Sequence, residues 1–368
     1  MANLSEIVAQ DAALEQLAGI LAGRRRPHAL IFAGPVGVGR RTTAEALAKV
    51  LLCPHSSESP DSPLPVACGQ CGGCRAFEAG SHGDYHLIKK ELGRFSKDPQ
   101  VRSRKMQNLG IGVVTEFLIA PANQGSVMGR GKVFVVREAE LMTTEAQNAL
   151  LKTLEEPPSG VTLILLCGAA HELLPTTRSR CALVRFGPLP RDFVSDRLIR
   201  EGVEVGEARF WAAYTQGSLG ESLRLAGGSL YAMKRELVDR LVAMDSGGAD
   251  LAEWLTKQAE KLTNATVAED RLLARSLAGR RVAALLLGLM AGVYRDVLSR
   301  SAGRDRPYIH ADQADAIDRL ASGRTPAVAA RIITQLAAYE KLLWRNVNAK
   351  TVWDNVTITC ATAAPLEV

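Results

Sequence analysis

The stretch that decides the fold is Gly34-Pro35-Val36-Gly37-Val38-Gly39-Arg40-Arg41-Thr42. An apolar run over residues 28–33 precedes it and predicts a buried strand, and a helical pattern over residues 43–52 follows it. A strand, a glycine-rich turn and a helix in this order are the setting of a phosphate-binding loop. Glycines allow the tight turn that directs backbone N–H groups and the helix N-terminus towards an anion.

The loop departs from the nucleotide-binding template G-x-x-x-x-G-K-[ST] at its two chemical positions. Gly34 and Gly39 match it, but Arg40 replaces the lysine and Arg41 replaces the magnesium-binding hydroxyl, while Thr42 comes one position late. We therefore expect a degenerate phosphate loop made of Gly34, Gly37, Gly39, Arg40 and Thr42. ATP binding without turnover stays open, because glycines and a helix N-terminus attract phosphate by themselves.

A second strand pattern, Lys132–Val136, ends where phosphate-loop ATPases carry an acidic pair that binds magnesium. Here the pair is Arg137-Glu138, and a cation in the first position would repel the metal. Glu138 could equally be a surface carboxylate paired with a nearby arginine.

The arginine triplet Arg24–Arg26 has two interpretations as well, because it could contact phosphates or cap the C-terminus of the preceding helix.

Four of the seven cysteines gather directly after the loop helix, at Cys53, Cys68, Cys71 and Cys74. Four thiolates are a complete ligand set for tetrahedral zinc, and the intervening glycines let the chain curl around the ion. Free cytosolic thiols and an iron–sulfur cluster are the alternatives, but the latter's usual trailing Cys-Pro is missing. With four thiolates and no open coordination position, the zinc would be structural.

Length and composition predict a large soluble protein. A chain of 368 residues favours two or three domains, and a net charge of +6 is too mild to identify a nucleic-acid partner. No signal peptide is expected, and the longest apolar run, residues 282–294, is too short to span a bilayer and predicts a buried helix. We expect a cytoplasmic protein with no membrane attachment.

Helical and strand patterns alternate up to residue 187 and predict an α/β domain with a parallel sheet covered by helices on both faces. Beyond about Leu189 no strand pattern remains. Residues 191–225 predict short helices, and long amphipathic helices are predicted at 231–244, 251–262, 269–299, 310–320 and 326–349, as in a helical bundle.

Five features occur together: the degenerate loop at 34–42, the four-cysteine insert, the segment from Asn148 to Pro158 (NALLKTLEEPP), Ser179-Arg180-Cys181, and Arg345-Asn-Val-Asn348. In this combination the chain resembles the AAA+ family of clamp-loader subunits of bacterial DNA polymerase III, most closely its delta-prime branch. The resemblance spans the chain and is strongest over residues 28–187. It implies an AAA+ core over residues 1–188 with a zinc-binding insert at 53–75, a helical lid over 189–229, and a helical collar over 230–368 that joins subunits.

The resemblance also implies roles for the site residues. In the family, the arginine of the Ser-Arg-Cys motif, here Arg180 between Ser179 and Cys181, reaches the ATP of a neighbouring subunit. The alternative is that Arg180 forms an ordinary ion pair and has no role at a nucleotide site. A further arginine often follows a glycine in the lid, and Gly217-Ser-Leu-Gly220 stands in its place, so another nucleotide contact is lost.

The implied function is that of a non-hydrolysing clamp-loader subunit, without ATPase activity of its own. It would work in a hetero-pentamer with gamma/tau and delta subunits and help to load the sliding clamp on primed DNA. One alternative is an active gamma/tau-type clamp-loader ATPase, against which Arg40, Arg41 and Arg137 argue. Another is a zinc-bearing DNA-binding module, which would need more basic and aromatic residues near Cys68–Cys74 than Arg75 and Phe77.

Overall fold

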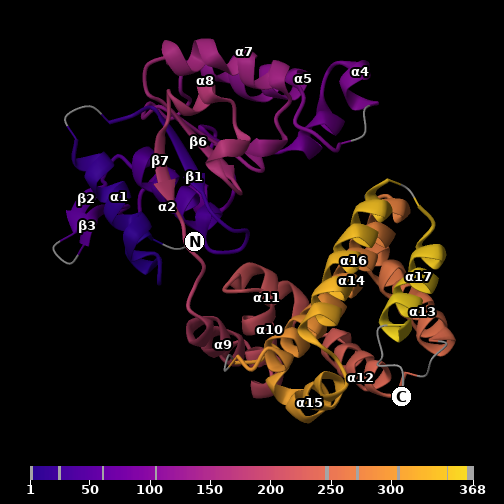
Figure 1. Ribbon diagram of the computed structural model, residues 1–368. Helices are drawn as coiled ribbons and strands as arrows, with labels where there is room; N and C mark the ends of the chain where they lie inside the picture. The colour runs from indigo at the N-terminus through magenta and orange to yellow at the C-terminus, as the bar shows by residue number, and fades with distance from the viewer. Residues whose placement is uncertain are drawn as a thin grey trace. The chain divides into compact units, whose positions relative to one another are not determined.

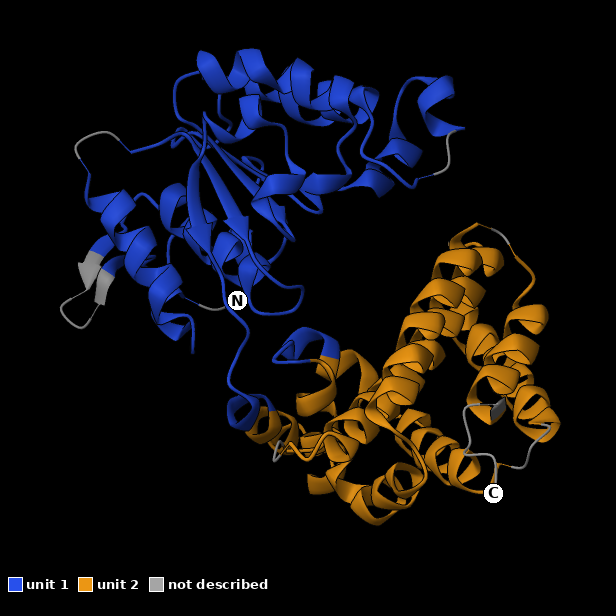
Figure 2. Cartoon of the chain, in the orientation of Figure 1, with its two compact units in different colours: residues 1–194, 216–221 blue, residues 195–215, 222–368 orange. Residues whose placement is uncertain are grey.

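The computed structural model describes residues 3–23, 26–59, 62–103, 106–244, 248–270, 273–304, 307–345 and 347–362. Arg24, Arg25 and Asn346, to which the sequence analysis drew attention, lie outside these ranges. The chain forms two compact units, one of residues 1–194 with 216–221 and one of residues 195–215 with 222–368 (Figure 2). The division into core, lid and collar stays a prediction.

A five-stranded parallel sheet organises the first unit (Figure 1). Its strands are β1 (Ala29–Ala33), β4 (Tyr85–Ile88), β5 (Lys132–Val136), β6 (Val161–Cys167) and β7 (Ala182–Arg185). They lie in the order β4-β5-β6-β1-β7, and every neighbouring pair is parallel. The predicted α/β fold class, a parallel sheet followed by an all-helical region, is therefore confirmed.

Both faces of the sheet are covered, which explains why its strands are continuous apolar runs. Side chains alternate between the faces, so Ile31 packs into one core with helices α5 and α7. Leu30 and Phe32 point to the opposite face, where α2 contacts β1, β5 and β6. The helices and short strands of this unit are α1 (Asp11–Ala22), α2 (Arg40–Leu52), β2 (Ser57–Ser59), β3 (Ser62–Val66), α3 (Gly72–Glu78), α4 (Pro99–Arg102), α5 (Ile111–Val114), α6 (Ala120–Ala122), α7 (Thr144–Glu155) and α8 (Pro175–Arg178). Short 3-10 turns occur at Leu4–Glu6, Lys90–Phe95, Ala139–Leu141 and Ala170–Glu172, and a π-helical turn at Thr115–Ile119 joins α5 to α6.

The described part of the second unit contains helices and no strand. They are α9 (Arg191–Arg200), which begins in the first unit, α10 (Val205–Tyr214), α11 (Leu219–Leu225), whose first turn belongs to the first unit, α12 (Leu230–Val242), α13 (Ala249–Glu269), α14 (Arg275–Ser301), α15 (Ala314–Ser322), α16 (Pro326–Trp344) and α17 (Ala349–Thr362), with a 3-10 turn at Ala311–Gln313.

Two predicted helix boundaries in this unit are wrong. The helix predicted to run to residue 349 ends at Trp344, and a separate helix, α17, starts at Ala349. The Asn348 side chain accepts a hydrogen bond from the backbone N–H of Lys350 at 2.9 Å, which caps the new helix and explains the break. The helix predicted to begin at residue 269 begins instead at Arg275, because α13 extends to Glu269.

Helix α14 is the core helix of this unit. By length and composition it is the one described helix that could cross a membrane. However, Leu286, Met290 and Val293 are fully buried, and the helix packs against α13, α15 and α16 (Figure 1). The apolar run at 282–294 therefore forms the buried helix that the sequence predicted.

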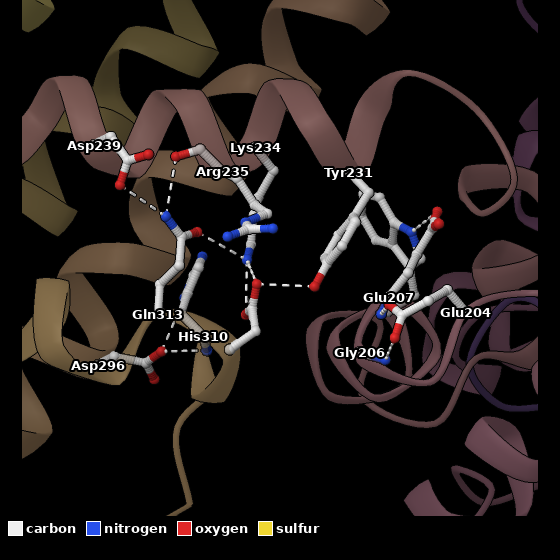
Figure 3. Close-up of polar contacts among 12 residues, drawn as sticks. Glu204, Gly206, Glu207, Tyr231, Lys234, Arg235, Asp239, Asp296, His310 and Gln313 are labelled. Atoms are coloured by element: carbon white, nitrogen blue, oxygen red, sulfur yellow. Dashed lines mark hydrogen bonds and ion pairs between the residues drawn. The ribbon is translucent and has the colours of Figure 1, made fainter.

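A buried polar cluster ties α12 to the chain that precedes α15 (Figure 3). The ammonium of Lys234, a fully buried residue, donates to both carboxylate oxygens of Asp312 at 2.6 and 2.8 Å and to Gln313 at 3.1 Å. Tyr231 donates to the same carboxylate at 2.9 Å. Burial lowers the pKa of Lys234, and the contact with Asp312 opposes that effect. The carboxylate therefore keeps a charged lysine in the interior.

Asp296 and His310 form a second buried pair in this cluster (Figure 3). The Asp296 carboxylate accepts hydrogen bonds from the backbone N–H groups of Ile309 and His310 and lies 2.9 Å from Nδ1 of His310. Burial lowers the pKa of His310 despite that carboxylate. A neutral ring with its proton on Nδ1 satisfies the contact and leaves only a lone pair on the buried Nε2, which has no partner among the residues that the structure describes. Together the two pairs connect α12, α14 and the turn before α15.

We expect Lys234→Ala to destabilise the second unit by about 2 kcal/mol, because it removes a fully buried side chain together with its charged hydrogen bonds to Asp312. All four tryptophans, at 211, 254, 344 and 353, lie in this unit, so urea unfolding followed by tryptophan fluorescence reports on it alone. Lys257→Ala is the control, because Lys257 forms an ion pair with Glu253 while both side chains are well exposed. Equal unfolding midpoints for the two variants would contradict the prediction.

Candidate functional site

The glycine-rich loop lies between β1 and α2, at the carboxyl end of the central strands. Gly37 and Gly39 have φ angles of +76° and +104°, which residues with a side chain rarely adopt. The carbonyl of Gly39 accepts a hydrogen bond from the backbone N–H of Thr43 at 2.9 Å, so the turn leads directly into the helix. Gly34, Gly37, Gly39 and Arg40 thus form the predicted strand, turn and helix N-terminus.

Arg40 does not point into the open loop. Its Nη1 donates to the carbonyl of Cys167, the last residue of the neighbouring strand β6. Burial lowers the pKa of Arg40, whereas the nearby carboxylates of Glu140 and Glu172 raise it. The guanidinium is therefore engaged within its own chain, in the region where a phosphate-loop lysine would meet phosphate.

The residues at the template's hydroxyl and acidic positions make contacts within the chain. Arg41 is exposed and pairs with Glu45 at 2.7 Å along the helix. Thr42 is exposed, and the next hydroxyl, on buried Thr43, donates to the Gly39 carbonyl at 3.0 Å. At the end of β5, Glu138 has a φ of +49° and lies 3.0 Å from Nζ of Lys90. Glu138 therefore forms an ion pair, with a lysine rather than the arginine considered above.

Segment 217–220 lies against the loop. The backbone N–H of Gly220 donates to the carbonyl of Gly37 at 2.9 Å. A Cβ added to Gly37 would lie 2.3 Å from the hydroxyl oxygen of Ser218. The glycines that replace the expected lid arginine therefore lie beside the phosphate loop, and they bring no cation to it.

Arg180 lies at the opposite edge of the sheet from the loop. It precedes β7, which runs parallel to β1 with Ala182 opposite Leu30. The loop follows the carboxyl end of β1, so a strand length of roughly 10 Å separates the two edges. The guanidinium is partly exposed and forms an ion pair with Glu155 at 2.5 Å. Arg180 and the loop of the same chain thus do not form one site.

Gln147 is a site residue that the sequence analysis missed. Its side-chain oxygen accepts from the backbone N–H of Leu174 at 2.9 Å and from the hydroxyl of Thr177 at 3.3 Å, and its amide donates to the Met142 carbonyl. These bonds fix α8, and with it the Ser-Arg-Cys motif, on α7. The available signal was a glutamine between the apolar residues Ala146 and Leu150 on the buried face of a predicted helix.

The four predicted metal ligands converge at the far end of α2. Their sulfur atoms all lie within 4.8 Å of one another. Cys53 is 3.6 Å from Cys68 and 3.9 Å from Cys71, and Cys68 is 4.0 Å from Cys74. Zinc–sulfur bonds of about 2.3 Å in a tetrahedron place the sulfurs about 3.8 Å apart, so the set fits a tetrahedral metal ion. It is the one such cluster among the described residues.

The pKa values of the cluster thiols are shifted in opposite directions. Backbone N–H groups of Gln70 and Cys71 lower the pKa of Cys68 to about 6. Burial raises the pKa of Cys74 to about 12, so a cation is needed before all four sulfurs ionise together. The guanidinium of Arg130 donates to the carbonyl of Cys53 at 3.3 Å and supplies positive charge beside the set.

Comparisons with known proteins find similarity to subunits of DNA polymerase III. A family model described as "DNA polymerase III, delta subunit" matches residues 9–190. DNA polymerase III subunit delta' of Bacillus subtilis is 27% identical over 340 residues, which cover 91% of each chain. The subunit delta' of Escherichia coli is 33% identical over 58% of this chain and 56% of its own length. The tau/gamma subunit of Haemophilus influenzae is 28% identical over 66% of this chain and 33% of its own length.

We expect the purified protein to contain one tetrahedrally bound metal ion per chain and Cys71→Ser to lose it, because three thiolates hold the ion less well than four. Elemental analysis after gel filtration measures both and identifies the metal. Cys181→Ser is the control, because Cys181 lies outside the cluster. A parent protein without metal, or Cys71→Ser with a full equivalent, would refute this assignment.

Proposed function

The chain belongs to the delta-prime clamp-loader family of DNA polymerase III, and on that premise we propose that it is a non-hydrolysing subunit that completes a neighbour's ATP site. In this role it helps to load the sliding clamp on primed DNA during replication. The proposal requires a phosphate loop that cannot turn over ATP and a cation that serves another subunit.

The observation that carries the proposal is the position of Arg40. Its guanidinium is bound to the Cys167 carbonyl and flanked by Glu140 and Glu172. A nucleotide would have to displace these contacts, and the carboxylates would repel its phosphates. Arg41 and Arg137 add two further departures from the magnesium-binding pattern. The chain's own ATP binding is therefore weak or absent, and hydrolysis is absent.

Arg180 is proposed as an arginine finger that acts in trans. It is partly exposed, and its place at the sheet edge away from the loop of the same chain supports action on a different subunit. Such an arginine stabilises the charge that develops on the transferred phosphoryl group. Ser179 and Cys181 flank it, and burial raises the pKa of Cys181 to about 12, so this thiol stays neutral.

The metal is proposed to be structural zinc, held by Cys53, Cys68, Cys71 and Cys74. All four ligands are thiolates, which leaves no open position for a substrate. Zinc would connect the end of α2 to α3 and stabilise the insert at 53–75.

The parts of the chain are assigned in the same way. Residues 1–188 are the AAA+ core, 189–229 the lid, and 230–368 the collar that joins gamma/tau and delta subunits in a hetero-pentamer. The proposed location is the cytoplasm, where replication takes place. An active gamma/tau-type ATPase is the competing function, and the following experiment separates the two.

The purified chain should hydrolyse ATP no faster than its Gly39→Asp variant, in which a carboxylate in the loop repels phosphate. Steady-state phosphate release and binding of a fluorescent ATP analogue test this. The converse variant, Arg40→Lys with Arg41→Thr and Arg137→Asp, should gain nucleotide affinity, because it frees the loop and restores the magnesium ligands. Turnover by the parent that Gly39→Asp abolishes would favour the gamma/tau-type ATPase instead.

Arg180→Ala should leave the protein folded and able to join the assembly, since exposed ion pairs contribute little to stability. Loss of an arginine finger lowers turnover at the affected site by about 10³-fold or more. Total ATPase falls only partly, because the assembly has other sites. Clamp loading on primed DNA is the sharper measurement, and it should become slow.

Arg178→Ala is the matched control, because Arg178 is exposed two residues earlier and could serve the same neighbour. It should load clamps at the parent rate. If Arg180→Ala loads as fast as the parent, the arginine-finger assignment is wrong.

A further inference from the structure

The two Nη atoms of Arg180 donate three hydrogen bonds to groups of the same chain. Nη1 donates to the carbonyl of Thr176 at 2.9 Å and to the hydroxyl of Ser179 at 3.3 Å. Nη2 donates to the Glu155 carboxylate at 2.5 Å. An arginine has five N–H donors, so within the described part of the chain Nε–H and one N–H of Nη2 remain after these three contacts. Two parallel N–H groups are what arginine presents to a phosphate in a bidentate pair.

Glu155 is poorly placed for helix stability. It is the last residue of α7, where the helix macrodipole disfavours a negative charge. Its carboxylate and Arg180 are both partly exposed, and such a pair adds little to folding. The contact nevertheless joins the end of α7 to Arg180, two residues beyond α8, and these two helices lie side by side (Figure 1). Its main effect is therefore on the orientation of the guanidinium.

We propose that Glu155 is a positioning residue for Arg180, which it orients so that the two remaining N–H donors face the phosphoryl group of the neighbouring subunit's ATP. This inference rests on the proposed function. Arginine loses much rotamer freedom when it is fixed, and a contact made before the neighbour binds removes that loss from the catalytic step. Donors that are already oriented stabilise developing charge without reorganisation.

The neighbouring Glu156 provides a matched control. It is exposed, carries the same charge and lies one residue further along the chain. No hydrogen bond or ion pair of its carboxylate occurs among the described residues. Replacing it changes the net charge as much as replacing Glu155 does, and it leaves the contacts of Arg180 intact.

The test uses the complete assembly with its ATPase subunits and compares Glu155→Ala, Glu155→Gln and Glu156→Ala. Glu155→Ala should lower kcat at the affected site by about tenfold and leave the KM for ATP unchanged. A loss of this size is smaller than the roughly hundredfold loss that a misplaced catalytic group can cause. Glu155→Gln should lose less, since its amide oxygen still accepts from Nη2. Glu156→Ala should match the parent. Circular dichroism and gel filtration confirm that each variant is folded and assembled.

A double variant separates positioning from any other role. In the Arg180→Ala background, Glu155→Ala should cause no further loss, because Glu155 acts only through that arginine. A further tenfold loss in that background, an unchanged or faster rate for Glu155→Ala alone, or an equal loss for Glu156→Ala would overturn the inference. If Arg180→Ala itself has no effect, the arginine-finger proposal falls. If only Glu155→Ala has none, that proposal stands and the role of Glu155 is rejected.

Discussion

A parallel sheet buried on both faces is the constraint on which the rest of this structure depends. Because every strand runs in the same direction, the segments that follow strands gather at one edge and those that precede them at the other. The glycine-rich loop follows β1, whereas Arg180 precedes β7, the strand beside it. The glycine-rich loop and Arg180 therefore lie at opposite edges of the same sheet, and one chain does not bring them together.

One arginine lies near each of these two edges of the sheet, Arg40 at the loop and Arg180 before β7, and their environments differ. Arg40 is partly buried, bonded to a strand carbonyl and flanked by two carboxylates, so its charge is used within the chain. Arg180 is bound to one exposed carboxylate, one carbonyl and one hydroxyl, and it keeps two donors for a partner. The same side-chain type is thus engaged within the chain at one edge and partly exposed at the other. The Lys234–Asp312 pair, of which the lysine is buried, shows a third use of a cation, in which it fixes helix packing in the second unit.

Much of the fold could be predicted because the strands are short, apolar and separated by clear helical patterns. The strands predicted over residues 28–33 and 132–136 match β1 and β5 within one residue. The failures occurred where local pattern is weak. The helix predicted over 326–349 is broken after Trp344, since Asn348 caps a new helix that the apolar periodicity did not reveal. The small β2–β3 pair inside the cysteine insert also escaped prediction, because its strands are rich in serine and proline.

The sequence by itself determined the residues of the loop and the set of cysteines that cluster. Lysine, hydroxyl and acid are absent from defined template positions, and Cys68, Cys71 and Cys74 are close enough along the chain for spacing alone to bring them together. Only the tertiary structure decided which groups the arginines meet. Cys167 lies 127 residues from Arg40, and Glu155 lies 25 residues from Arg180. Such partners are set by strand order and helix packing, which depend on the whole buried core and leave no periodic signal in the sequence near either arginine.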